Sequence, residues 1–124
     1  MDEKDPLTGL VIAAAIEVHR EMGPGLLESV YQTCLEEEFK IRGIVCLPQH
    51  RLPLVYKGRT LEDEFVLDFY FPNQLVVELK AVVRIIPVFE AQLLSYLRLT
   101  RTHVGLLFNF NAPVMRDGIK RMVL

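Results

Sequence analysis

The amino-acid sequence predicts an α/β protein in which a mixed four-stranded sheet is flanked by helices. Three observations predict this class: two N-terminal segments with apolar residues at helical spacing, four later runs rich in β-branched and aromatic residues, and another helical segment between the third run and the fourth. With 124 residues, 51% of them hydrophobic, the chain has the size and apolar content of one packed domain. We therefore predict a single domain over residues 1–124.

Two helices are predicted at the start of the chain. Apolar residues recur with a period of about 3.6 over residues 8–21, and the pattern stops at Gly23-Pro24-Gly25, where a helix cannot propagate. The same period resumes at Leu26 and continues to Phe39, until Gly43 provides a helix stop signal.

Strands and one more helix follow these segments. We predict strands over residues 45–56, 61–71, 75–82 and 103–110, a hairpin turn at 57–60, and a helix over 88–100. The apolar tail, residues 118–124, is suited to add an edge strand.

The second turn of the sheet determines how the middle strands pair. Pro72-Asn73-Gln74 is a three-residue loop, so Phe71 should pair with Leu75. Period-two alternation then gives each strand one wholly apolar face, which in the second strand carries Phe65, Leu67, Phe69 and Phe71. On the opposite face, the same register sets Asp68 across from Glu78.

Two carboxylates in this position repel each other, because facing side chains lie roughly 5 Å apart at Cβ. Compensation can come from a shared proton, from Lys80 on the same strand face as Glu78, or from a divalent metal held by carboxylate oxygens. The pattern leaves two interpretations open. Asp68, Glu78 and Lys80 form either a metal site or an ion network without a ligand.

Two pairs of helical residues are further candidates for a site. Glu28 and Tyr31 share a face near a helix N-terminus, and Gln92 and Tyr96 share a face of the later helix. Each pair also has an ordinary explanation, since the helix dipole favours a carboxylate in the first turn, and a Gln–Tyr pair commonly forms a surface hydrogen bond.

Composition excludes several classes of protein. No apolar run approaches the roughly 18 residues of a membrane span, and the N-terminal MDEKDP is acidic, unlike a signal peptide, so we expect a cytoplasmic protein without membrane contact. The net charge of −2 argues against a generally basic surface that coats nucleic acid. Cys34 and Cys46 lie in separate apolar segments, which predicts two reduced thiols without a zinc site or a disulfide.

Four ordered blocks together resemble a known family. IEVHREMGPGLLESVYQTCLEEEF contains the signature of the GxxExxY proteins, and FVLDFYFPNQLVVELKAV with AQLLSYLRLTRTHVGLLFNF resembles the family's remaining blocks. That family is similar to the PD-(D/E)xK nuclease superfamily, with its restriction-endonuclease-like αβββαβ core. The resemblance implies this core with one extra N-terminal helix. One departure is Leu67, which stands where the superfamily motif has proline.

The resemblance also implies roles for individual residues. Asp68 becomes the motif aspartate, Glu78 and Lys80 the ExK pair, and Glu28 the acidic residue from the early helix. Gln92 and Tyr96 match a Q-x-x-x-Y motif of some branches. We expect Asp68 and Glu78, with the Leu79 carbonyl, to hold Mg²⁺ or Mn²⁺, and Glu28 to reach the ion through water or to aid a second ion.

The implied activity is metal-dependent hydrolysis of phosphodiester bonds in DNA or RNA. Lys80 would orient the attacking water or neutralise transition-state charge, and Gln92 and Tyr96 would position the phosphate or a metal-bound water. Three arginines, Arg84, Arg98 and Arg101, would track the nucleic-acid backbone. The alternative is a non-catalytic nucleic-acid-binding or protein-interaction module with the same fold. Exposed sheet edges and the apolar tail favour a homodimer, and so small a core also suits a partner protein that confers specificity.

Overall fold

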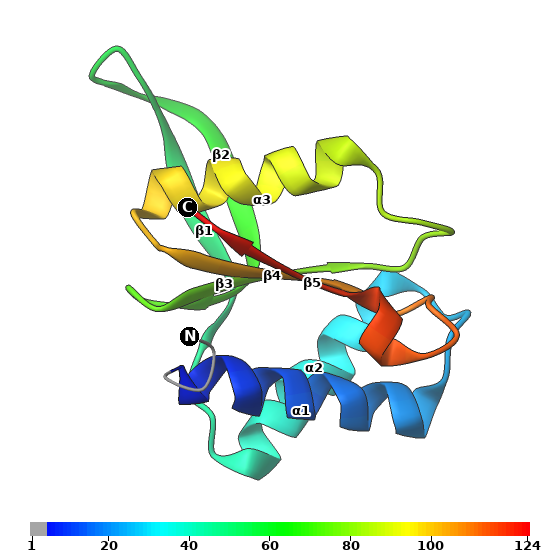
Figure 1. Ribbon diagram of the computed structural model, residues 1–124. Coiled ribbons are helices and arrows are strands. Elements are labelled where there is room, and N and C mark those ends of the chain that lie inside the picture. Colours follow the sequence, from blue (N-terminus) through cyan, green and yellow to red (C-terminus); the bar gives the residue numbers. More distant parts are fainter. Residues whose placement is uncertain (1–4) are drawn as a thin grey trace.

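A computed structural model describes residues 5–124, so the first four residues of the acidic N-terminal segment lie outside the described part. The elements are α1 (Pro6–Met22), α2 (Glu28–Arg42), β1 (Leu47–Tyr56), β2 (Arg59–Phe71), β3 (Leu75–Lys80), α3 (Pro87–Thr100), β4 (Val104–Asn109), the 3₁₀ turn η2 (Met115–Gly118) and β5 (Ile119–Val123). Figure 1 shows α1 and α2 on one side of the sheet and α3 on the other. This arrangement confirms the predicted α/β class and the order of its elements.

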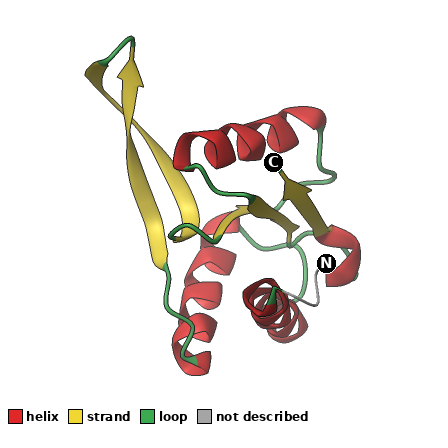
Figure 2. Cartoon of the chain, turned by 60° about the vertical axis from the view of Figure 1, so that its left-hand side comes forward, coloured by secondary structure: helices red, strands yellow, loops and turns green. Residues whose placement is uncertain are grey.

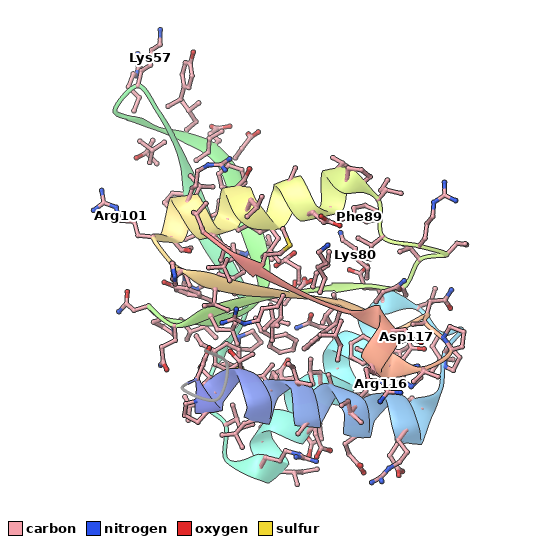
Figure 3. All side chains as sticks on the ribbon, in the orientation of Figure 1. Lys57, Lys80, Phe89, Arg101, Arg116 and Asp117 are labelled. Carbon is pink, nitrogen blue, oxygen red and sulfur yellow. The ribbon has the colours of Figure 1, made fainter. Side chains whose placement is uncertain are left out.

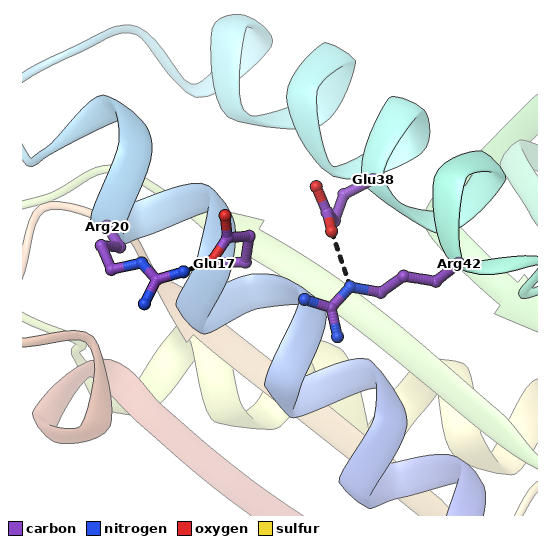
Figure 4. A network of polar contacts seen from close by, with 4 residues as sticks. All are labelled: Glu17, Arg20, Glu38 and Arg42. Atoms are coloured by element: carbon purple, nitrogen blue, oxygen red, sulfur yellow. Dashed lines mark hydrogen bonds and ion pairs between the residues drawn. The ribbon is translucent and has the colours of Figure 1, made fainter.

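Local chemistry explains where α1 begins and where both N-terminal helices end. The Asp5 carboxylate accepts a hydrogen bond from the Thr8 N–H and caps α1, which ends at Gly23 with a φ of 71°. Gly43, with a φ of 70°, ends α2 in the left-handed conformation that favours glycine. Ion pairs within each helix join Glu17 to Arg20 and Glu38 to Arg42 (Figure 4).

The sheet has the order β1-β2-β3-β4-β5 and is mixed. Only β3 and β4 run parallel, which requires the crossover that α3 supplies, and the other neighbours are antiparallel. The predicted sheet had four strands, and the fifth is the apolar tail, which pairs with β4 as an edge strand. Central β3 is therefore covered by a helical layer on each face, which explains why its apolar residues form an almost continuous run.

Two apolar clusters hold these layers together. The first joins α1 and α2 to the sheet, with Phe39 edge-on to Phe69 and Phe71. The second joins α3 to the other face, where Leu93 and Leu97 pack with residues of the sheet. Because one cluster packs against each face of β3, the position of the candidate residues at the end of this strand is fixed by the core.

The hairpin of β1 and β2 extends past the layers as a two-stranded arm, residues 53–64 (Figure 2). Its turn is only Lys57-Gly58, rather than the predicted four residues, and both have positive φ, 49° and 77°. Such values define the two-residue turn that matches strand twist, so pairing continues to Tyr56 and Arg59. Every side chain of the arm except that of Leu54 is exposed.

The predicted pairing of Phe71 with Leu75 is confirmed. The prediction of one wholly apolar face for β2 is wrong, because Phe65 and Leu67 lie in the cluster under α3, whereas Phe69 and Phe71 lie in the cluster under α1 and α2. Along β2, the alternation of side chains between the two faces of the sheet therefore changes phase at Asp68. Its expected partner Gln49 has a φ of 49°, and the β1–β2 ladder omits this one step between His50↔Leu67 and Pro48↔Phe69.

Within residues 5–124, no helix has the length and apolar character needed to cross a membrane. Cys34 and Cys46 are free and half-buried. Burial, with a smaller effect of the Glu36 charge, raises the pKa of the Cys46 thiol to about 11. The Cys46 sulfur is therefore protonated at neutral pH.

Candidate active site

The candidate site lies where β2 separates from β3. The ladder between these strands ends at Phe69 and Val77, and side chains continue the pairing beyond that point. The Asp68 N–H donates to Glu78 Oε2 at 2.9 Å, and the Leu79 N–H donates to Asp68 Oδ2 at 2.8 Å. The two carboxylates thus lie side by side at the end of the strand pair, as the register predicted.

The electrostatics of this pair favour bound positive charge or a proton. Glu78 is only 5% exposed, and burial, followed by repulsion from Asp68, raises its pKa to about 8. Burial also raises the pKa of Asp68, although the hydrogen bonds from Leu79 and Gln49 lower it in part. Two adjacent carboxylates in a desolvated position are a natural site for a cation.

Lys80 supplies one positive charge to the site. Its half-buried side chain leaves the end of β3 towards α3, where Nζ lies 3.5 Å from Gln92 Oε1 and 4.6 Å from the centroid of the Phe89 ring (Figure 3). The Lys80 charge lowers the pKa of Asp68 and of Glu78, but burial outweighs it in both. The ammonium therefore lies close enough to influence both carboxylates, while its direct contacts are an amide and a ring of α3.

Glu28 approaches the site from the first turn of α2. Burial and then repulsion from Asp68 raise the pKa of its carboxyl group, and the Lys80 charge lowers it. A hollow of about 390 Å³ lies between Glu28 and Asp68, and its remaining lining residues are Ser29, Gln32 and Gln49. The structure therefore places Glu28 across this hollow from Asp68.

The predicted pair on α3 also reaches the site. Gln92 contacts Lys80, and Tyr96 is 8% exposed with its ring edge-on to Phe65. Burial, then the charges of Glu78 and Asp68, raise the pKa of the Tyr96 hydroxyl. All the sequence-predicted side chains thus come together around the end of β3.

Three further residues hold this arrangement and were missed from the sequence. Gln32 donates to the Asp68 backbone carbonyl at 3.2 Å, and Gln49 donates to Asp68 Oδ1 at 3.3 Å. Buried Asn109 bonds both the N–H and the carbonyl of Val82, which fixes the chain just after Lys80. Gln32 lies one helical turn after Glu28 and could have been found by that spacing, but nothing in the sequence pattern singles out Gln49 or Asn109.

The donor set suits a hard divalent cation such as Mg²⁺ or Mn²⁺. Asp68 and Glu78 present carboxylate oxygens, and the Leu79 carbonyl points to the same side as its N–H, towards Asp68. Glu78 Oε1 accepts no hydrogen bond from residues 5–124. In that part of the chain, no group of three His, Cys, Asp or Glu side chains is arranged to hold a metal ion. The role of Glu28 therefore stays a prediction.

Comparison with known proteins identifies the superfamily of the chain. A model of the PD-(D/E)XK nuclease superfamily matches residues 5–122. Because the match spans nearly the whole chain, the protein belongs to this superfamily. Neither the curated proteins nor the solved structures gave a match.

Proposed function

We propose that the protein is a metal-dependent nuclease that hydrolyses phosphodiester bonds in DNA or RNA. The observation that carries this proposal is the arrangement at the end of β3, where the buried carboxylate pair of Asp68 and Glu78 stands beside the Lys80 ammonium. Superfamily membership supports it, since the name of the superfamily describes this motif. The finer assignment to the GxxExxY proteins remains our proposal from the sequence blocks.

In this proposal, Asp68 and Glu78 hold the ion, together with the Leu79 carbonyl. A bound Mg²⁺ or Mn²⁺ would act as a Lewis acid on a phosphate oxygen and activate a water for in-line attack. Glu78 would enter this role as a carboxylate only when the ion displaces its proton, because its pKa of about 8 keeps it largely protonated at neutral pH. Glu28 would bind water on the far side of the hollow.

Lys80 would bind the phosphate oxygen that gains negative charge during attack. Its Nζ contacts Gln92 and lies over the Phe89 ring, and both contacts favour this position of the ammonium. Tyr96 would donate its hydroxyl proton to the phosphate, and the raised pKa keeps that proton in place.

Outside the site, exposed Arg84, Arg98 and Arg101 would contact the nucleic-acid backbone. Arg98 and Arg101 lie at the C-terminal end of α3 with Thr102 and His103, around a surface hollow. Arginines are suited to phosphate because their planar donors match its oxygens. A homodimer or a partner protein would enlarge this small binding surface.

Cleavage of plasmid DNA and of a structured RNA with and without Mn²⁺ tests the proposal. We expect Lys80→Ala to abolish metal-dependent cleavage, by a factor of roughly 10² or more, while the protein stays folded. Lys40→Ala is the matched control, because Lys40 lies exposed on α2 and its one ion pair within residues 5–124 is with Glu36, at 3.8 Å. Nucleic-acid binding without cleavage in the wild type would instead identify a non-catalytic module.

A further inference from the structure

Asp68 is detached from both strands beside it. The β1–β2 ladder omits it, and the β2–β3 ladder ends one residue away. A buried backbone that loses ladder bonds must find other partners. Glu78 Oε2 accepts the Asp68 N–H, Gln32 donates to its carbonyl, Leu79 donates to Oδ2 and Gln49 donates to Oδ1. Three separate elements, α2, β1 and β3, thus share the task of holding one residue.

Gln49 is unusual among these partners because of its backbone. Four non-glycine residues in the described chain have positive φ, and three of them stand where such values are ordinary: Lys57 and Asn73 in turns, and Arg101 at a helix C-cap. Gln49, with a φ of 49°, lies inside a strand. This conformation is unfavourable for an L-residue, so the local backbone is strained where the side chain meets Asp68.

This strain has a geometric result. Rotating the backbone at position 49 interrupts the ladder at one step, and the amide of Gln49 then lies within 3.3 Å of Asp68 Oδ1. With Leu79 on Oδ2, both oxygens of the Asp68 carboxylate have a fixed donor. Each carboxylate oxygen can accept more than one partner, so these two hydrogen bonds leave lone pairs on Asp68 for a cation.

We propose that Gln49 is a positioning residue of the nuclease site, whose amide holds the Asp68 carboxylate at the angle required for binding a divalent cation. This inference rests on the proposed function. Gln49 touches neither ion nor phosphate; it acts only through Asp68. Partners of this kind, hydrogen-bonded to a metal-binding carboxylate, typically change metal affinity 10- to 100-fold when they are removed.

Glycine at position 49 separates this role from a structural one. Gln49→Gly removes the amide but suits the positive φ, so the strand conformation is kept. We expect the melting temperature to stay close to that of the wild type, because relief of strain offsets the lost hydrogen bond and the added chain entropy. If Gln49 served only to hold the strand, this variant would bind metal normally.

The matched control is Asn73→Gly. Asn73 has a φ of 66° and lies exposed in the turn between β2 and β3, between Asp68 and Glu78 in the sequence. The substitution makes the same change of backbone preference without removing a contact to Asp68. We expect its Mn²⁺ affinity to equal that of the wild type.

The experiment is calorimetric titration of Mn²⁺ into the wild type, Gln49→Gly and Asn73→Gly, with thermal unfolding of each protein without metal. We expect Gln49→Gly to bind Mn²⁺ at least about tenfold more weakly than the other two proteins. Equal affinity in all three would overturn the positioning role while leaving the metal site intact. Absence of Mn²⁺ binding by the wild type would overturn the metal site of the proposed function, and this inference with it. Unfolding of Gln49→Gly alone would overturn the inference by showing a structural role.

Discussion

The two ends of the β1–β2 hairpin both depart from a regular ladder, but different partners replace the lost hydrogen bonds at each end. In the arm the register shifts between Pro53 and Val55, and the surrounding side chains are exposed. At the other end one step is missing at Gln49 and Asp68, and hydrogen bonds from α2 and β3 replace it. In the arm, water can satisfy the released groups, whereas at the site the protein does so itself.

An irregular strand can therefore support a chemical site only when its backbone and side-chain groups are held in place. Near the arm's turn, the Lys57 ammonium lies 5.6 Å from the centroid of the exposed Tyr56 ring, a weak contact in water. At the site, the Lys80 ammonium lies on the ring of Phe89 and against Gln92. The two lysines have the same chemistry but different freedom.

The largest predicted difference between the two ends concerns the pH dependence of stability. Burial raises the pKa of Glu78 from 4.5 to about 8, so the folded state favours its protonated form. The associated stability is fully present below pH 4.5 and is lost as pH rises through about 8, a change of roughly 4 kcal/mol without metal. Glu78→Gln removes this titration and should therefore be more stable than the wild type at about pH 9 but similar near pH 4.5.

Urea denaturation across this pH range, with a chelator present, measures the difference. Glu64→Gln is the control in the arm, where the Glu64 carboxylate is exposed and lies 3.4 Å from Arg51. Its stability relative to the wild type should change little with pH, because solvent screens the pair. If the stability of Glu78→Gln relative to the wild type were equally independent of pH, the raised pKa of the buried Glu78 carboxyl group would be contradicted.

The second prediction compares two leucines of the same strand. Leu67 is fully buried in the cluster under α3, whereas Leu61 in the arm is 44% exposed. Leu67→Ala should lower the free energy of unfolding by about 3 kcal/mol, because it leaves a cavity, and Leu61→Ala by less than about 0.5 kcal/mol. Chemical denaturation of both variants is the measurement. Similar losses would show that the arm is packed against something in solution.

The smallest predicted effect lies at the tip of the arm. Gly58 has a φ of 77° and open space around it, so Gly58→Ala meets no clash but adopts a conformation unfavourable to alanine. We expect a loss of about 1 kcal/mol, seen as a small fall in melting temperature, with no change in Mn²⁺ affinity. Weakened Mn²⁺ binding would mean that the arm and the site are coupled.

Sequence patterns predicted the order of the elements and the meeting of Asp68, Glu78 and Lys80 at the end of β3, but not the residues that hold them there. Loop length fixed the pairing of Phe71 with Leu75, and alternation from Leu75 to Lys80 placed Glu78 and Lys80 on the same face. The change of phase at Asp68 could not be predicted, because it depends on side-chain hydrogen bonds between residues far apart in sequence. Gln32 and Gln49, 36 and 19 positions from Asp68, illustrate this limit.

The crossed hydrogen bonds between β2 and β3 have a spectroscopic consequence. The amide protons of Asp68 and Leu79 each point at a carboxylate rather than at a peptide carbonyl. Their NMR chemical shifts should therefore follow the charge of that carboxylate, since a charged acceptor forms the stronger bond. Two backbone resonances would then report protonation and cation binding separately: the Asp68 amide for Glu78, and the Leu79 amide for Asp68.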